Sequence, residues 1–126
     1  MSRFVEVTTE RALLSGVGPR VPILTVDSGR SGPVAAVGAN LHGDECTGLG
    51  AVHSLLRILP SVLLVGRVHL YPSLNPVGLE QGTRRLPGDL LDPNRAFPGS
   101  SRGSRAERHA ARLWSDLAAR RLNLYI

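Results

Sequence analysis

An apolar segment followed by a glycine-rich turn and a helical pattern constrains the fold of this chain more than any other feature. Residues 33–37 are apolar and predict a short buried strand, and the apolar spacing across residues 49–59 predicts a helix. Between them, residues 38–48 read Gly-Ala-Asn-Leu-His-Gly-Asp-Glu-Cys-Thr-Gly. A strand that leads through a tight turn into a helix is typical of α/β proteins, in which ligands bind at the carboxyl ends of the strands.

Two side chains in this turn have the chemistry of metal ligands. His42 and Glu45 stand three residues apart, and a first helical turn would bring both to the same side. A catalytic zinc site takes such nitrogen and oxygen ligands, with three from the protein and a water in the fourth position. A histidine three residues before a glutamate is common in helices that bind no metal. The glycines around this pair, however, permit a close backbone approach that a solvated helix does not need.

Length and composition are those of a soluble globular domain, and we expect residues 1–126 to form a single one. The 126 residues are 42% hydrophobic and 20% charged. No apolar run is long enough to span a membrane, and the sequence does not open with a secretory signal. The single cysteine, Cys46, excludes an internal disulfide, and we expect it to be a small buried hydrophobe. These features favour a cytoplasmic protein without a membrane partner.

The net charge of +5 comes from a basic set that contains arginine and no lysine. Six of these arginines lie between residues 102 and 121 on a helical pattern, which predicts a solvated helix face. Aromatic residues, which would stack on bases, make up only 4% of the chain, and no nucleic-acid motif is present. We therefore expect no nucleic-acid partner.

The remaining pattern predicts a mixed β-sheet flanked by helices. Polar, glycine-rich residues 27–32 favour a hairpin between the strands on either side, and Pro60 is expected to end the first helix. Ser104 and Glu107 form a capping box that predicts the start of a second helix. Residues 73–101 are rich in proline and glycine and predict a long functional loop. The predicted strands cover residues 4–7, 21–26, 33–38, 62–71 and 122–126, and the predicted helices cover residues 46–59 and 104–120.

Four short motifs together resemble the zinc carboxypeptidase superfamily, and within it the succinylglutamate desuccinylase and aspartoacylase branch. They are Gly38–Gly48, Asn75-Pro76-Val77-Gly78, Arg84 and the segment Asn94–Gly99. The resemblance extends from about Pro33 to Arg120. Pro93 departs from the family pattern, in which a leucine commonly precedes the Asn-Arg pair. The resemblance implies a zinc-carboxypeptidase-like α/β fold.

The resemblance also implies a role for each matching residue. His42 and Glu45 match the first two Zn²⁺ ligands. Arg84 matches the catalytic arginine that contacts the substrate, polarises the scissile carbonyl and stabilises its oxyanion. Asn94 and Arg95 match the pair that holds the carboxylate of a small-molecule substrate. The implied activity is a zinc-dependent amidohydrolase, or deacylase, that acts on an N-acyl amino acid or a similar small carboxylate.

Two groups that the family uses have no match in this chain. The third zinc ligand is a histidine on the strand that begins near Leu122, and the general base is a glutamate further along. The chain ends at Ile126, so we expect the N-terminal portion of a hydrolase domain that binds zinc weakly and is inactive alone. We expect no ligand among the other histidines: His53 points elsewhere, His69 packs in the core, and His109 lies on the exposed arginine-rich helix.

Two other functions remain open. A zinc carboxypeptidase that removes C-terminal residues from peptides would share every motif of this chain. A scaffold with the same fold would have lost catalysis and metal. In either case, surfaces left uncovered by truncation would favour a homo-oligomer.

Overall fold

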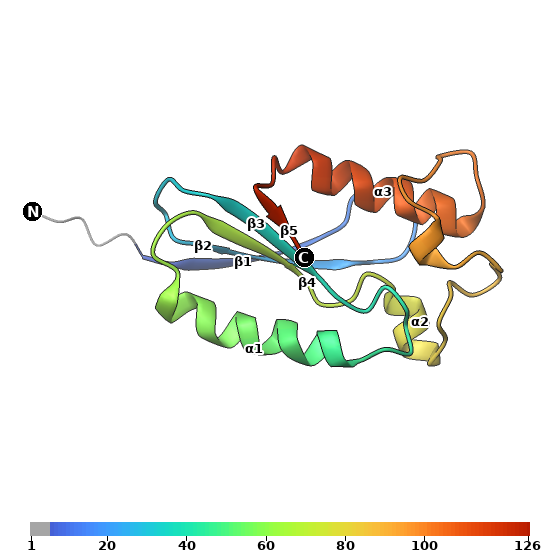
Figure 1. The fold of residues 1–126 in the computed structure, drawn as a ribbon, viewed down its shortest axis with the longest axis horizontal. Coiled ribbons are helices and arrows are strands. Elements are labelled where there is room, and N and C mark those ends of the chain that lie inside the picture. Colours follow the sequence, from blue (N-terminus) through green and yellow to red (C-terminus); the bar gives the residue numbers. More distant parts are fainter. Residues whose placement is uncertain (1–5) are drawn as a thin grey trace, which may run out of the picture.

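A mixed five-stranded sheet with helices on both faces forms the frame of the molecule, as the sequence predicts (Figure 1). The structure, a computed structural model, describes residues 6–126. Helix α1 covers one face of the sheet and α3 covers the other. The strands are β1 (Thr8–Leu13), β2 (Pro22–Asp27), β3 (Val34–Gly38), β4 (Arg67–Tyr71) and β5 (Leu124–Tyr125); the helices are α1 (Thr47–Val62), α2 (Pro76–Gln81), the short 3₁₀ helix η1 (Pro93–Arg95) and α3 (Arg105–Ala119).

The strands lie in the order β1-β2-β4-β3-β5, and this order overturns one prediction. β2 pairs with β1 and β4 in antiparallel fashion, whereas β3 pairs with β4 and β5 in parallel fashion. The hairpin predicted between β2 and β3 is therefore wrong, because β4 lies between them. Ser28, in the connecting loop, explains the outcome: its N–H and hydroxyl both donate to the carbonyl of Gly66, at 3.0 and 2.7 Å, and thereby align the start of β4 with the end of β2.

Several predicted boundaries were also wrong. The strand expected at residues 4–7 falls largely outside the described residues, and the first strand runs from Thr8 to Leu13. Pro60 does not end α1, which continues to Val62. A proline in the last turn removes only its own hydrogen bond, and the Leu63 N–H still donates to Leu59 at 2.9 Å. Because α1 extends this far, β4 begins at Arg67 and not at residue 62.

The hydrophobic core has one layer on each side of the sheet. Ile23, Tyr71 and Leu113 belong to the layer under α3, and Val52 and Leu70 belong to the layer under α1. All five side chains are at most 2% exposed. No helix among the described residues is long and apolar enough to cross a membrane.

The segment between β4 and α3 has more structure than a loop. It contains α2 and η1, and a small third cluster of Leu86, Ala96, Ala106 and Ala110 packs it against α3. The capping box at the start of α3 is present as predicted: the Glu107 N–H donates to the Ser104 hydroxyl and the Ser104 N–H donates to the Glu107 carboxylate.

The predicted solvated arginine face of α3 is wrong for one residue at least. The Arg112 guanidinium folds over the chain and donates to the carbonyls of Leu14, Ser15 and Pro19 at 3.1–3.3 Å. It thereby ties the loop between β1 and β2 to the middle of α3. A guanidinium has five N–H donors in a fixed plane, so a single side chain can bond several carbonyls at once.

A polar network under α3 is built around His69 of β4, which is buried as the sequence predicts. Its Nδ1 accepts from the Thr25 hydroxyl at 2.7 Å and from Arg120 at 3.0 Å. Arg120 is also held by two contacts with Asp116, at 3.0 and 3.1 Å. Burial, together with the nearby Arg120 charge, lowers the pKa of His69 to about 4, so the imidazole stays neutral in the folded protein.

This network predicts an acid-sensitive stability. His69 is protonated near pH 6.5 in the unfolded chain and only near pH 4 in the folded chain. The contribution of neutral His69 to the free energy of unfolding is therefore complete above pH 6.5 and is lost as the pH falls toward 4. At its steepest the loss is about 1.4 kcal/mol per pH unit. In urea unfolding across this range, His69→Gln is expected to flatten the profile, whereas the exposed control His53→Gln keeps it. A His69→Gln profile as steep as the wild type would contradict the prediction.

Candidate functional site

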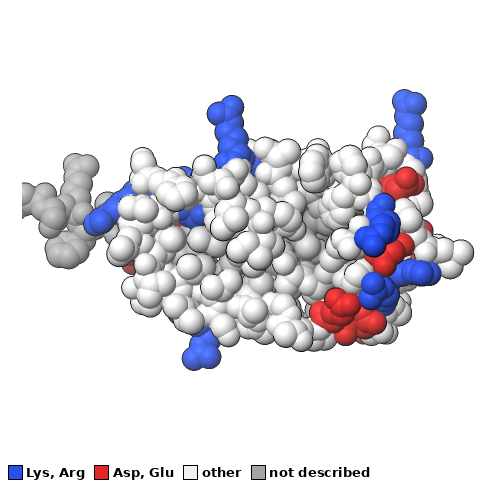
Figure 2. All heavy atoms as spheres, viewed as in Figure 1, with Lys and Arg blue, Asp and Glu red and all other residues white. Residues whose placement is uncertain are grey.

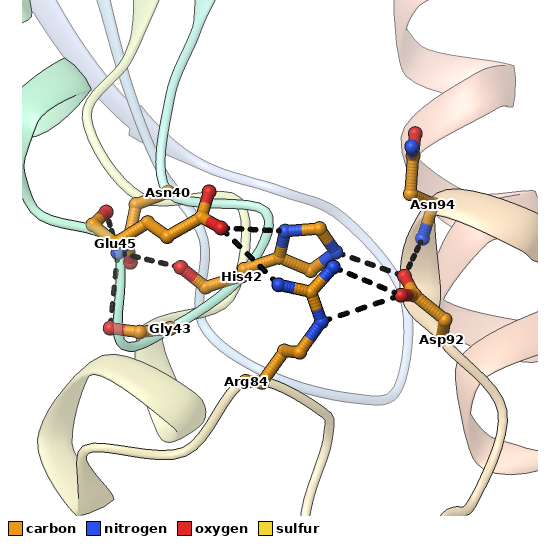
Figure 3. Close-up of polar contacts among 7 residues, drawn as sticks. All are labelled: Asn40, His42, Gly43, Glu45, Arg84, Asp92 and Asn94. Carbon is orange, nitrogen blue, oxygen red and sulfur yellow. Dashed lines mark hydrogen bonds and ion pairs between the residues drawn. The ribbon is translucent and has the colours of Figure 1, made fainter.

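The turn between β3 and α1 brings His42 and Glu45 together. The His42 Nδ1 lies 3.3 Å from the Glu45 Oε1, so the two side chains converge (Figure 3). The Glu45 N–H donates to the His42 carbonyl at 3.0 Å and closes the turn. Helix α1 begins only at Thr47, so a hydrogen-bonded turn before the helix juxtaposes the pair, and not the first helical turn that the sequence suggested.

Asn40 holds this turn in shape, and the sequence analysis did not single it out. Its side-chain amide donates to the carbonyls of His42, Gly43 and Glu45 at 2.8–3.1 Å, and its Oδ1 accepts from the Ser73 hydroxyl at 2.6 Å. The residue is buried, and its φ of 60° lies in the left-handed region. Asparagine tolerates that conformation better than most residues, which is the signal that could have identified it.

Gly43 allows the turn to press against α2. A side chain at this position would place its Cβ 2.1 Å from the backbone of Gly78, so only glycine fits. The Gly43 N–H also donates to the Arg84 carbonyl at 3.3 Å. Asn75 caps α2 by accepting from the Gly78 N–H at 2.9 Å. The turn, α2 and the segment that carries Arg84 therefore form one packed unit.

Arg84 and Asp92 complete a cluster of charged groups around His42 (Figure 3). Arg84 reaches the Glu45 Oε1 at 3.2 Å and the Asp92 Oδ2 at 3.2 Å. The Asp92 Oδ1 lies 2.8 Å from the His42 Nε2. The hydrogen bond with His42 and the bond from the Asn94 N–H hold the pKa of the Asp92 carboxyl well below its usual range. Asp92 was not predicted from the sequence, although it stands two residues before Asn94.

The structure does not bring the side chains of Asn94 and Arg95 into this cluster. Asn94 contributes its backbone N–H, which donates to Asp92 at 2.8 Å, and its side chain extends away from His42 (Figure 3). Arg95 is exposed, and its guanidinium contacts the Asn94 carbonyl at 3.4 Å. Both residues stand beside the cluster on η1. A carboxylate-binding role for them therefore rests on the family resemblance.

Two expectations about nearby residues were wrong. Cys46 is exposed and not buried. It is the N-cap residue of α1, one position before the helix begins, so the Cys46 side chain lies outside the core. His109 is buried rather than exposed, and its Nε2 donates to the Leu74 carbonyl at 2.7 Å. It faces the core because it shares the inner side of α3 with Ala106, Ala110 and Leu113.

The donor set fits part of a zinc site. The His42 Nδ1 and a Glu45 oxygen face each other, while the His42 Nε2 is held by a carboxylate, an arrangement typical of zinc-bound histidines. Among residues 6–126, no group of three or more His, Cys, Asp or Glu side chains is placed to hold a metal. The described residues therefore offer two groups of the types that zinc binds and a carboxylate that could orient one of them, but not a closed coordination shell.

Charged side chains gather at this end on one face of the molecule. On the face shown in Figure 2, acidic and basic side chains gather at the end where α2 and the start of α3 lie in Figure 1, and most of the remaining face is uncharged.

The chain belongs to the family defined by the succinylglutamate desuccinylase/aspartoacylase catalytic domain, whose model matches residues 31–124. Over 90 residues it is 36% identical to the N-alpha-acetyl-L-2,4-diaminobutyric acid deacetylase of Halomonas elongata. The match covers 71% of this chain but only 26% of that relative.

Solved structures agree with this assignment. An aspartoacylase family protein from Mesorhizobium loti superposes with a TM-score of 0.80 at 27% identity, covering 95% of this chain and 39% of its own. A succinylglutamate desuccinylase/aspartoacylase from Rhodobacter sphaeroides gives 0.75 at 33% identity, with 95% and 38% covered. A metallo-carboxypeptidase from Burkholderia cenocepacia, at 15% identity and a TM-score of 0.76 over 95% of this chain and 35% of its own, shares the fold. The chain thus spans less than two fifths of these relatives.

Two substitutions separate the hydrogen-bonding role of the Asn40 amide from the role of its left-handed backbone conformation. Asn40→Gly keeps the left-handed backbone accessible but removes the amide, and we expect it to lower the free energy of unfolding by about 1–3 kcal/mol. Asn40→Ala loses the same hydrogen bonds and also strains the backbone, so it should cost about 1 kcal/mol more. Urea unfolding measures both values. Equal stability of the two variants would show that the backbone conformation does not constrain this position.

Proposed function

We propose that this chain contributes the N-terminal part of the active site of a zinc-dependent amidohydrolase. The substrate would be an N-acyl amino acid or a similar small carboxylate. The observation that carries the proposal is the convergence of His42 and Glu45 within a cluster that also contains Arg84 and Asp92. Membership of the desuccinylase/aspartoacylase family supports the reaction class. The similarity to a deacetylase of an N-acetylated diamino acid supports the substrate class.

His42 and Glu45 would hold the metal in this proposal. When bound, Zn²⁺ acts as a Lewis acid on the amide carbonyl and lowers the pKa of a coordinated water to about 7. Asp92 accepts the hydrogen bond from the His42 Nε2, so it selects the tautomer whose Nδ1 lone pair faces Glu45. The same contact orients the ring and makes it a better ligand, and Asp92 therefore acts as a positioning residue.

Arg84 would stabilise the negative charge that develops on the carbonyl oxygen. Its guanidinium is held between Glu45 and Asp92 but remains about half exposed, at 49%, so a substrate can reach it. Loss of one comparable donor in an oxyanion site costs about 3–4 kcal/mol of transition-state stabilisation. Asn94 and Arg95, on η1 beside the cluster, would bind the substrate carboxylate. A planar guanidinium suits that task because it can donate two parallel hydrogen bonds.

The proposal assigns the third zinc ligand and the general base to residues outside these 126. A peptide-cleaving carboxypeptidase is the second candidate, because metallo-carboxypeptidases share the fold. A scaffold that binds no metal is the third. We favour the deacylase because the relatives that are similar in sequence belong to the deacylase branch.

Zinc binding by the 126-residue chain tests the ligand assignment directly. We expect weak binding of one Zn²⁺ in competition with a chromophoric chelator. His42→Ala and Glu45→Ala should each weaken it at least tenfold, and Asp92→Asn by about 10–100-fold because the orienting carboxylate is lost. His53→Ala, an exposed histidine of α1, is the matched control and should bind like the wild type. Unchanged affinity in His42→Ala would place the zinc elsewhere.

The reaction is tested in a full-length protein that carries these residues. N-Acetyl and N-succinyl amino acids should be hydrolysed faster than peptides with a free carboxyl terminus, and the 126-residue chain alone should show no turnover. Arg84→Gln is expected to lower kcat/KM about 100–1,000-fold, whereas its exposed neighbour Arg85→Gln should stay near the wild type. Preferential peptide cleavage would favour a carboxypeptidase, and a full-length protein purified without zinc would favour the scaffold.

A further inference from the structure

A cavity lies beside the segment that follows Arg84. Its volume is about 300 Å³, which is within the range of small-molecule sites. Apolar side chains that include Val77 and Leu86 line one part of it, and Arg105, Arg108 and Arg112 of α3 line another. None of the four clustered residues of the candidate site, His42, Glu45, Arg84 and Asp92, lines this cavity. It is therefore separate in composition from the proposed zinc site.

Three arginines of α3 line the cavity, and those at positions 105 and 108 are exposed to solvent. Residues 105, 108 and 112 are three and four positions apart, so they lie along the same side of α3. Arg105 is also the first residue of the helix, and the next N–H group, that of Ala106, already donates to the Asp89 carboxylate at 2.7 Å. Among the described residues, no carboxylate forms a salt bridge with any of the three, and the cavity lining contains no acidic residue.

Two of these arginines keep donors for a ligand. Arg105 and Arg108 each use one Nη1 group, which donates at 2.6 Å to the carbonyls of Pro87 and Gly103 respectively. Their Nε and Nη2 groups make no hydrogen bond within residues 6–126. Arg112, by contrast, is committed to the carbonyls of the loop between β1 and β2 and fixes that wall of the cavity.

His109 contributes a neutral, buried surface to the same cavity. It is 3% exposed, its Nε2 is bonded to the Leu74 carbonyl, and its Nδ1 has no partner among the described residues. Burial lowers the pKa of His109, so the imidazole adds no charge beside the arginines. The cavity thus combines two available guanidinium groups with uncharged walls.

We propose that this cavity binds a small organic oxyanion, a carboxylate or a phosphate ester. The anionic head would contact Arg105 and Arg108, and its apolar body would pack on Val77 and Leu86. The site goes beyond the proposed deacylase reaction and does not depend on it. Its occupant would touch the segment that carries Arg84, because Leu86 is two residues further along and the Arg84 carbonyl is bonded to Gly43. The bound anion would therefore stabilise the position of Arg84.

Methyl NMR of the 126-residue chain tests this site with three probes that contain six carbon atoms each. Hexanoate and hexyl phosphate carry the anionic head, and hexan-1-ol lacks it. We expect the two anions to shift the methyl signals of Val17, Val77 and Leu86 in a saturable way, and hexan-1-ol to bind at least tenfold more weakly. The two anionic arms show which head is preferred. No shift with either anion, or equal binding of hexan-1-ol, would overturn the proposal.

Charge-removing variants separate this cavity from the proposed zinc site. Arg105→Gln combined with Arg108→Gln should weaken anion binding at least tenfold, and Arg108→Gln alone provides a variant that keeps the Arg105–Pro87 contact. Arg30→Gln, on an exposed loop, removes the same charge elsewhere and should bind normally. Arg84→Gln should also retain binding to this cavity, whatever its effect on hydrolysis. Wild-type affinity in a folded Arg108→Gln and in the double variant would refute the assignment.

Discussion

The side-chain amide of Asn40 is the interaction on which the candidate site depends. It donates to three carbonyls of one turn, and its oxygen accepts from Ser73 at the end of the neighbouring strand. The backbone of a turn that must present side chains cannot satisfy its own carbonyls in a helix or a sheet, and unsatisfied buried carbonyls are costly. One buried amide removes that cost and at the same time fixes the backbone positions from which the side chains of His42 and Glu45 extend.

The charged cluster around His42 is balanced so that each group has a partner of the opposite sign. Arg84 contacts two carboxylates, and Asp92 contacts both Arg84 and the imidazole. The arginines of α3 have no such balance, although they lie on the other side of the same segment. The two environments differ in chemistry: one pairs an imidazole and carboxylates with a single guanidinium, and the other places guanidinium groups beside apolar side chains.

The sequence predicted the features that depend on local pattern. The strand, turn and helix around residue 42, the capping box of α3, the mixed sheet and the family were all recognised from short motifs. Features set by distant contacts were missed. The place of β4 between β2 and β3 depends on Ser28 and Gly66, 38 residues apart, and the Leu74 carbonyl that bonds the buried His109 lies 35 residues away from it.

The site itself was predicted only in part for the same reason. His42 and Glu45 are neighbours in the sequence, so their spacing revealed them. Asp92 contacts His42 from 50 residues away in the sequence, and no local pattern predicts that contact. Asn94 and Arg95 were inferred from a motif, but a motif does not say where a flexible, exposed side chain points.

The pairing of β3 with β4 has a consequence for how this architecture tolerates change. Gly38 at the end of β3 stands opposite Tyr71 at the end of β4, so the two chains leave the sheet side by side and meet again through Asn40 and Ser73. An insertion or deletion of one residue inside β4 would displace Ser73 from Asn40 and turn the side chains beyond the change to the opposite face. The orientation of His42 and Glu45 is thus tied to the length of β4, and changes in length are better tolerated in exposed loops than inside this strand.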